Sequence, residues 1–388
     1  MIKLKTDKTM NNWNHLVVIG FIILSFVLDF VDKADIFYDL VFFKFNTILK
    51  LFFLAFTLIY ITIHFRKVFS QLRFSLLIIV VISILFLLKS NFSQRYLLEY
   101  ARYFLVLSSF PVLYHIYISK ERSYKMEYYK LFKYFIVVNT LCVFIGMLFD
   151  IKVFETYRYD RLGYNGIILS QGMTPFIYTS CTLVFLELKK KKLIFLTLLL
   201  SILSGVKSVY LAQFILISLV VINNTMLTRK YKMRALAIST AGFLFILLFL
   251  FKSTTFKDVI ASDGFWSAVF SYRIDNTIEL LNLIHADNYN IFIGATNLVK
   301  VRLELQIVDI LLFYGLIGCI SYILWTYFYY KKLVETYTSK AFFISIITIA
   351  ILSGNLLYIP LSFILVTIVL MLFSKTTKIT TKQNQLTL

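Results

Sequence analysis

The sequence predicts an all-α polytopic integral membrane protein. Hydrophobic residues make up 60% of the 388 residues, charged residues only 15%, and the chain contains three prolines. Apolar runs long enough to cross a bilayer recur from one end to the other, and a soluble domain could not bury so much apolar surface. We therefore expect a single transmembrane helical domain over residues 1–388.

The N-terminal apolar run is expected to be a retained first span and not a removable signal peptide. Basic residues precede it, but it ends at Asp29 and Asp32 and lacks a small-residue cleavage site. The three cysteines, Cys142, Cys181 and Cys319, lie inside apolar runs without a pairing motif. We expect neither a disulfide nor a cysteine metal site.

The expected spans follow from runs of about 20 apolar residues, or fewer for helices inside the bundle. The first four cover residues 16–31, 47–65, 74–88 and 103–118, the fifth ends at 149, and the sixth ends just before the basic cluster 189–192. Two later single spans cover residues 235–251 and 307–328.

Two further apolar runs are long enough to be split into pairs of short helices. The run 193–222 has basic clusters at both ends, which one helix would place on opposite sides of the membrane. It is interrupted by Ser204-Gly205-Val206-Lys207, and a Gly beside a charged residue is unfavourable in mid-helix at membrane depth. We expect two helices meeting there, with Lys207 at the outer face. The run 341–373 repeats the pattern, with a break at 353–355.

These assignments give about twelve spans with both termini on the inner side. The net charge is +20, and the connectors and tails placed inside carry the excess of Lys and Arg, as the positive-inside rule requires. The charge therefore indicates membrane orientation and not a nucleic-acid partner. Residues 252–306 become one large external loop, and residues 374–388 a cytoplasmic tail.

The sequence contains no nucleotide-binding loop, nucleophile elbow or HExxH zinc motif. Its four histidines lie far apart without ligand spacing. We expect no metal and no cofactor. What remains as candidate chemistry is an outward-facing set of cations and carboxylates.

Lys207 is the clearest candidate cation. A phosphate there would also meet backbone N–H groups at the start of the following helix, whereas the alternative is a side chain that snorkels to the interface. Arg273 lies on an expected amphipathic helix over 270–284, where it could instead pair with Asp275 or Glu279.

A Tyr-rich outer connector supplies Arg158, Arg161 and Tyr164, and Arg302 is the remaining outer cation. Arg and aromatic residues together suit sugar rings and phosphates, although Tyr is also common at membrane interfaces.

The candidate carboxylates are Glu304 and Asp309 at the start of the tenth span. Asp309 lies within apolar sequence and is expected to face the protein interior or an aqueous cavity. Either carboxylate suits a general base, and either could instead be a structural partner of a nearby Lys or Arg.

Several segments resemble the bacterial O-antigen polymerase and O-antigen ligase superfamily. They are SGVKSVYLA (204–212), SYRID (271–275) with NIFIGATN (290–297), ELQIVDILLFYGLIG (304–318) and RYDRLGYNG (158–166), and the similarity covers residues 130–330. Ligases of this superfamily have His-Asn where this chain has Glu304, and an Arg is expected where it has Lys207. Both departures favour the polymerase branch.

The resemblance implies a GT-C-like polysaccharide polymerase in the bacterial inner (cytoplasmic) membrane. Such an enzyme joins undecaprenyl-diphosphate-linked repeat units into O-antigen or capsular polysaccharide at the outer face, without a metal. Membrane lipid is a partner, and a chain-length regulator and a flippase are further partners that it allows. The implied roles are diphosphate binding for Lys207, Arg273 and Arg161, proton acceptance for Glu304 or Asp309, and glycan binding for Arg158, Tyr164 and Arg302.

Three alternatives stay open. The first is the related ligase, against which Glu304 in place of His counts. The second is a glycosyltransferase that uses lipid-monophosphate sugars, for which the first outer connector offers acidic residues at 29, 32, 35 and 39. The third is a transporter or glycolipid flippase, although we find no pair of similar halves.

Overall fold

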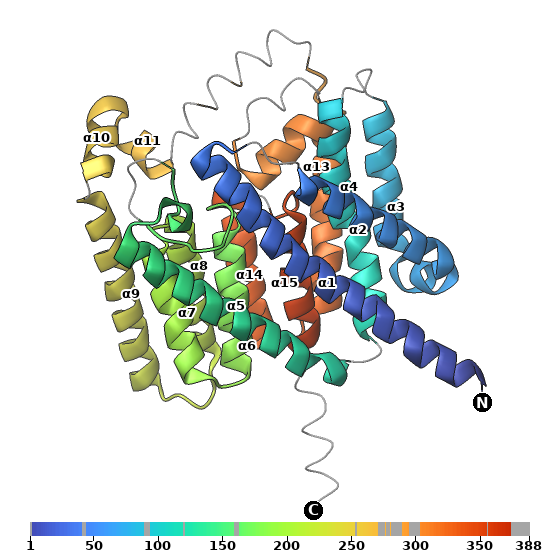
Figure 1. Cartoon of the computed structure of the whole chain (residues 1–388), viewed down its shortest axis with the longest axis horizontal. Helices are drawn as coiled ribbons and strands as arrows, with labels where there is room; N and C mark the ends of the chain where they lie inside the picture. Colours follow the sequence, from blue (N-terminus) through green and yellow to red (C-terminus); the bar gives the residue numbers. More distant parts are fainter. Residues whose placement is uncertain are drawn as a thin grey trace, which may run out of the picture.

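Apolar helices of unequal length pack side by side in the computed structural model of the chain (Figure 1). The structure describes residues 2–40, 44–88, 94–118, 121–158, 163–252, 254–270, 276, 280, 289–294, 303–354 and 356–373. Within these ranges the regular structure is helical, apart from an isolated antiparallel bridge between Glu155 and Tyr164.

The first part of the chain contains α-helices of 13 to 37 residues and one short turn of 3-10 helix. These are α1 (Ile2–Tyr38), α2 (Phe45–Ile63), α3 (Phe65–Leu87), α4 (Gln94–Ile118), α5 (Glu121–Phe149), η1 (Lys152–Phe154), α6 (Thr174–Glu187) and α7 (Lys191–Leu203). The remaining described helices are α8 (Lys207–Asn223), α9 (Arg229–Phe251), α10 (Thr254–Asp263), α11 (Phe265–Phe270), α13 (Gln306–Leu333), α14 (Tyr337–Ser353) and α15 (Pro360–Phe373).

Six of the described helices are long and apolar enough to cross a membrane. They are Trp13–Tyr38, Phe45–Ile63, Phe65–Leu87, Tyr124–Phe149, Arg229–Phe249 and Gln306–Leu333. Shorter apolar helices are Lys207–Asn223, Tyr337–Ser353 and Pro360–Phe373. The structure therefore confirms an α-helical, multi-pass architecture, while the count of twelve spans stays a prediction.

The centre of the bundle is formed by α15, α4 and α6. Every residue of α15 is buried, and this helix packs against α4, α5 and α6. A helix that is apolar on all sides and completely enclosed belongs in the core, since it needs no polar face. By contrast, α9 lies at the edge beside α8 and exposes large apolar side chains such as Phe245 and Phe249, which suit contact with lipid.

The two predicted helix breaks are confirmed. Helix α7 ends at Leu203, α8 begins at Lys207, and Gly205 between them has a left-handed φ of 68°. Helix α14 ends at Ser353, and α15 begins at Pro360. An additional break inside α13 lies at Gly315, where φ is 66° and ψ is −169°.

Several expected boundaries were wrong. Helix α1 runs from Ile2 to Tyr38, so the acidic connector expected after residue 31 is largely helical. Helix α3 starts at Phe65, directly after His64, and contains a kink at Leu72, so the basic connector expected before residue 74 is itself helical. Helix α4 starts at Gln94 and not near residue 103. Glu99 and Arg102 lie in this first part of α4, and both side chains contact Tyr358 of the α14–α15 connection.

Several helices are too short to cross a bilayer alone. Helices α6, α7 and α15 contain 14, 13 and 14 residues. At 1.5 Å per residue each covers about 20 Å, whereas the hydrocarbon core is about 30 Å thick. Irregular backbone must therefore lie at membrane depth, which is tolerated where it is buried in protein or lines a cavity.

Candidate functional site

A cleft of about 320 Å³ lies where these irregular segments meet the neighbouring helices. Its charged lining residues are Asp29, Lys50, Arg102 and Glu304. The remaining lining comes from residues 169–173, before α6, and from the α14–α15 connection with the start of α15: Leu169, Ser170, Gln171, Gly172, Met173, Gly354, Tyr358, Ile359, Pro360 and Leu361. Segments far apart in sequence thus share one cleft, in which four charged side chains stand among mostly apolar neighbours.

The cleft lies below one end of the bundle. By helix rise, Asp29 is about 14 Å before the end of α1, Lys50 about 8 Å after the start of α2, and Arg102 about 12 Å after the start of α4. The up-and-down order of the helices places these ends on the same side as α10, α11 and the start of α13 (Figure 1). This is the side that the sequence predicts to be external.

On the α1–α2 wall, Asp29 is 3% exposed and is held by the side-chain amide of Asn46. Asn46 Nδ2 donates to Asp29 Oδ1 at 2.5 Å and to Asp32 Oδ2 at 2.9 Å. Lys50 follows Asn46 by one turn and lies close enough for its charge to interact with both carboxylates and with Arg102. A buried carboxylate with an amide donor and a nearby ammonium can stay ionised at membrane depth.

On the opposite wall, Arg102, Glu99 and Tyr358 form a second cluster. Arg102 Nη1 lies 3.5 Å from Glu99 Oε1, and the guanidinium lies 4.8 Å from the centroid of the Tyr358 ring. The Tyr358 hydroxyl donates to Glu99 Oε1 at 2.9 Å. These contacts fasten the α14–α15 connection to α4, because Tyr358 belongs to that connection.

Glu304 is exposed and has a left-handed φ of 55°, which is uncommon for a residue with a side chain. Asp309 is buried and accepts a hydrogen bond from the backbone N–H of Leu303 at 3.1 Å. Its carboxylate thereby fixes the turn that carries Glu304 and does not itself line the cleft. The side chain of Gln306 accepts from the N–H of Leu357 at 3.0 Å, which joins the same turn to the α14–α15 connection.

Lys207 lies at the predicted break but outside the cleft lining. Its Nζ donates to the carbonyl of Ala268 at 2.7 Å and lies 4.3 Å from the centroid of the Phe256 ring. Lys207 therefore ties the start of α8 to α10 and α11, which belong to the long run expected outside the membrane.

The connector that contains Tyr164 closes the end of α7. The N–H of Tyr164 donates to the carbonyl of Leu203 at 2.8 Å, and the hydroxyl of Thr156 donates to the carbonyl of Ser204 at 2.6 Å. A Cβ on Gly163 would lie 2.9 Å from the carbonyl carbon of Ser204, so a glycine is needed for this approach. Two segments of the family resemblance, 158–166 and 204–212, thus pack on each other and cap a helix end.

Arg158 forms an ion pair with Asp39. Its Nη2 lies 2.6 Å from Asp39 Oδ1 and 2.5 Å from Oδ2, and Asp39 is largely exposed. This pair joins the end of α1 to the connector after η1. The predicted glycan-binding role of Arg158 stays a prediction, as does that of Tyr164.

Lys33 of α1 holds the wall-forming connector from within the bundle. It is completely buried, and its Nζ donates to Asn165 Oδ1 at 2.6 Å and to the carbonyl of Gly166 at 2.7 Å. In the same connector, burial raises the pKa of the Glu155 carboxyl, and the nearby charge of Asp150 adds to the shift. Residues 169–173 leave this anchored turn and reach the cleft.

Three predicted site residues, Arg161, Arg273 and Arg302, lie outside the described residues. Lys50 and Arg102 were missed. The available signal was a charge next to or within an apolar run, which at membrane depth indicates a partner or a function. Among the described residues no group of three His, Cys, Asp or Glu could hold a metal ion.

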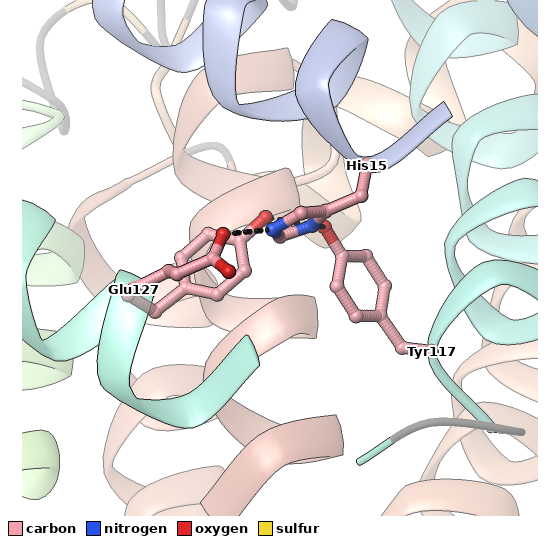
Figure 2. A network of polar contacts seen from close by, with 4 residues as sticks. His15, Tyr117 and Glu127 are labelled. Carbon is pink, nitrogen blue, oxygen red and sulfur yellow. Dashed lines mark hydrogen bonds and ion pairs between the residues drawn. The ribbon is translucent and has the colours of Figure 1, made fainter. Parts of the chain in front are cut away.

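A second polar cluster lies away from the cleft, between α1, α4 and α5 (Figure 2). His15 is buried, with Nδ1 2.9 Å from the Tyr117 hydroxyl and Nε2 2.6 Å from Glu127 Oε2. The Tyr117 hydroxyl also contacts that of Tyr128, and the His15 ring lies 3.7 Å from the ring of Tyr124. Each of these contacts joins two helices, so we assign this cluster to helix packing.

The fold and the cleft define a multi-pass α-helical membrane protein with a cleft that contains charged side chains beside the α14–α15 connection. Comparison of the chain with protein-family models, curated proteins and solved structures finds no match. The function is therefore inferred from the residues of the site.

Proposed function

We propose that the protein is a polysaccharide polymerase of the bacterial cytoplasmic membrane. In this proposal it joins undecaprenyl-diphosphate-linked repeat units into O-antigen or capsular polysaccharide at the outer face. The observation that supports it best is the shared cleft of Glu304, Asp29, Lys50 and Arg102. It brings carboxylates and cations together, and one of them, Glu304, begins a segment that resembles this superfamily.

The chemistry needs both kinds of charge. A hydroxyl of one repeat unit attacks the anomeric carbon of another, and the diphosphate leaves with the bonding electron pair. A carboxylate that accepts the hydroxyl proton and cations near the departing diphosphate each lower the barrier. Asp29 and Glu304 are the carboxylates of the cleft, and Lys50 and Arg102 are its cations.

The location of the cleft suits a lipid-linked substrate. The charged side chains lie about 8–14 Å below the ends of their helices, within the bundle and within reach of a headgroup at the membrane surface. Tyr358 adds an aromatic ring beside Arg102, and aromatic rings are suited to stacking on the apolar faces of sugars.

We assign different roles to the other predicted residues. The contacts of Lys207, Arg158 and Asp309 favour roles in holding the walls and the loop, because each binds another segment of the chain. Arg161, Arg273 and Arg302 stay candidates for diphosphate and glycan binding.

The test is a gel of surface glycan from a host strain that lacks this protein. The proposal predicts that the ladder collapses to a single repeat unit on its normal acceptor. Long chains that accumulate on the carrier lipid, with none on the acceptor, would identify a ligase instead. An unchanged ladder would contradict any role in glycan assembly.

A glycolipid flippase is the second candidate, and the break between α14 and α15, which lines the cleft, favours it. Broken helices that line a charged cavity are also found in transporters. In a strain that lacks a flippase, lipid-linked repeat units would accumulate on the inner leaflet. In a strain that lacks a polymerase they would accumulate on the outer leaflet, so their accessibility to an added glycosidase separates the two functions.

A further inference from the structure

The two carboxylates of the cleft differ in their surroundings. Asp29 is 3% exposed and forms part of the wall, whereas the side chain of Glu304 is exposed. Water competes for the oxygens of an exposed carboxylate, while a carboxylate removed from water interacts more strongly with a bound hydroxyl. The buried position therefore suits proton transfer better.

The carboxylate of Asp29 is also held in a fixed orientation by a hydrogen bond. Asn46 Nδ2 donates to its Oδ1 at 2.5 Å, and Asn46 is itself 3% exposed, so the pair is enclosed by protein. Lys50 lies near enough to interact with the Asp29 charge and lines the same cleft. A carboxylate that is fixed by a neighbouring amide and lines a cleft has the arrangement expected for activation of a hydroxyl.

Asp32 provides an internal comparison. It lies one turn after Asp29 on α1 and accepts a hydrogen bond from the same Asn46 Nδ2, at 2.9 Å. It does not line the cleft. The two aspartates thus share a helix and a hydrogen-bond donor and differ in access to the cavity.

We propose that Asp29 is the catalytic base that accepts the proton of the attacking hydroxyl. This inference rests on the proposed polymerase function. The proton moves to the Asp29 carboxylate as the acceptor oxygen bonds to the anomeric carbon. The bond from that carbon to the diphosphate oxygen breaks, and its electron pair leaves with the undecaprenyl diphosphate. Glu304, which lines the same cleft, is assigned to the binding of sugar hydroxyls.

The experiment uses the full-length protein in lipid nanodiscs. The substrate is the undecaprenyl-diphosphate-linked repeat unit extracted from the host strain that lacks the protein. Wild type is compared with Asp29→Asn and Asp32→Asn, and chain formation is measured against substrate concentration. We expect kcat to fall about 10²–10⁴-fold for Asp29→Asn with KM nearly unchanged, which is the range for loss of a general base. Asp32→Asn should stay within about threefold of wild type.

Equal activity of Asp29→Asn and wild type would overturn the role of Asp29 and leave the polymerase function intact. Equal loss in both variants would also overturn it, since it would point to the shared Asn46 contact. A wild-type protein that makes no polymer would overturn the proposed function, and the role of Asp29 with it. If Asp29→Asn does not fold, Asp29→Glu serves instead: it should retain measurable turnover, and a folded Asp29→Glu without any would contradict the proposal.

Discussion

Gly294 packs directly against Gly315, and this contact seats the turn before α13 in the break of that helix. A Cβ on Gly294 would lie 2.6 Å from the carbonyl oxygen of Phe313 and 2.7 Å from the nitrogen of Gly315. Both glycines have left-handed φ angles, 78° and 66°. The N–H of Leu316, freed by the break, donates to the carbonyl of Ile291 at 2.8 Å. Two segments of the family resemblance therefore meet, and their glycines are required by the contact.

Substitution of either glycine should destabilise the protein. Gly294→Ala and Gly315→Ala each place a methyl group on backbone atoms, and overpacking of this kind costs about 1–3 kcal/mol, to which the left-handed φ adds about 1–2 kcal/mol. The matched control is Gly242→Ala in α9, where a Cβ meets nothing within 4 Å and helix propensity improves. Thermal unfolding of the purified protein checks this. Equal melting temperatures for Gly294→Ala and Gly242→Ala would show that the contact is not tight.

Lys33→Met should loosen the connector that forms one wall of the cleft. The substitution leaves Asn165 Oδ1 and the carbonyl of Gly166 buried without their donor, which costs about 1–3 kcal/mol for each group. Lys340→Met is the control, because Lys340 is exposed. Thermal unfolding should show a lower melting temperature for Lys33→Met alone. A Lys33→Met protein as stable as the control would mean that water replaces the ammonium.

Variants of the Arg158–Asp39 pair distinguish two roles of Arg158, a structural tether and a glycan-binding residue. If the pair only joins the two segments, Arg158→Gln, Asp39→Asn and the double variant should lower the free energy of unfolding by the same small amount. A coupling energy of about 0.2–1 kcal/mol is expected for a partly exposed pair. Thermal unfolding of the three variants measures the coupling energy, and their polymerisation kinetics test for a role in glycan binding. A raised KM for Arg158→Gln with normal kinetics for Asp39→Asn would support the predicted contact between Arg158 and glycan.

His15 should matter more for stability than its partner Glu127. His15→Ala leaves the Tyr117 hydroxyl buried without this partner and removes the ring beside Tyr124, with an expected loss of about 1–3 kcal/mol. The side chain of Glu127 is 48% exposed, so Glu127→Gln keeps an acceptor and should change stability by less than about 1 kcal/mol. Melting temperatures check the order, and a larger loss for Glu127→Gln would contradict it.

The sequence predicted the class of fold and two of the helix breaks for local reasons. Run length and the Gly-Val-Lys interruption indicate the break at 204–207 without knowledge of any neighbour. The break at Gly315 was not predicted, because FYGLIG reads as continuous apolar helix until the turn at 291–294 is docked on it.

The site was predictable only in part. Glu304 lies at the cleft, as expected for a functional carboxylate, but Asp29, Lys50 and Arg102 join it from α1, α2 and α4 through tertiary packing alone. No spacing within the sequence predicts that these four side chains share a cleft. The sequence also predicts Asp309 as a candidate base. Its carboxylate accepts a hydrogen bond from the N–H of Leu303, and this contact depends on a turn that the sequence does not reveal.

The most direct test of the central claim, that the cleft is where chains are elongated, is a surface-glycan gel in the deletion strain. The strain is complemented with wild type, Arg102→Gln, Glu304→Gln or the exposed control Lys340→Gln, each at equal amount in the membrane. The account predicts a full ladder for wild type and the control, and short or single repeats for both cleft variants. Full ladders from Arg102→Gln and Glu304→Gln would contradict it.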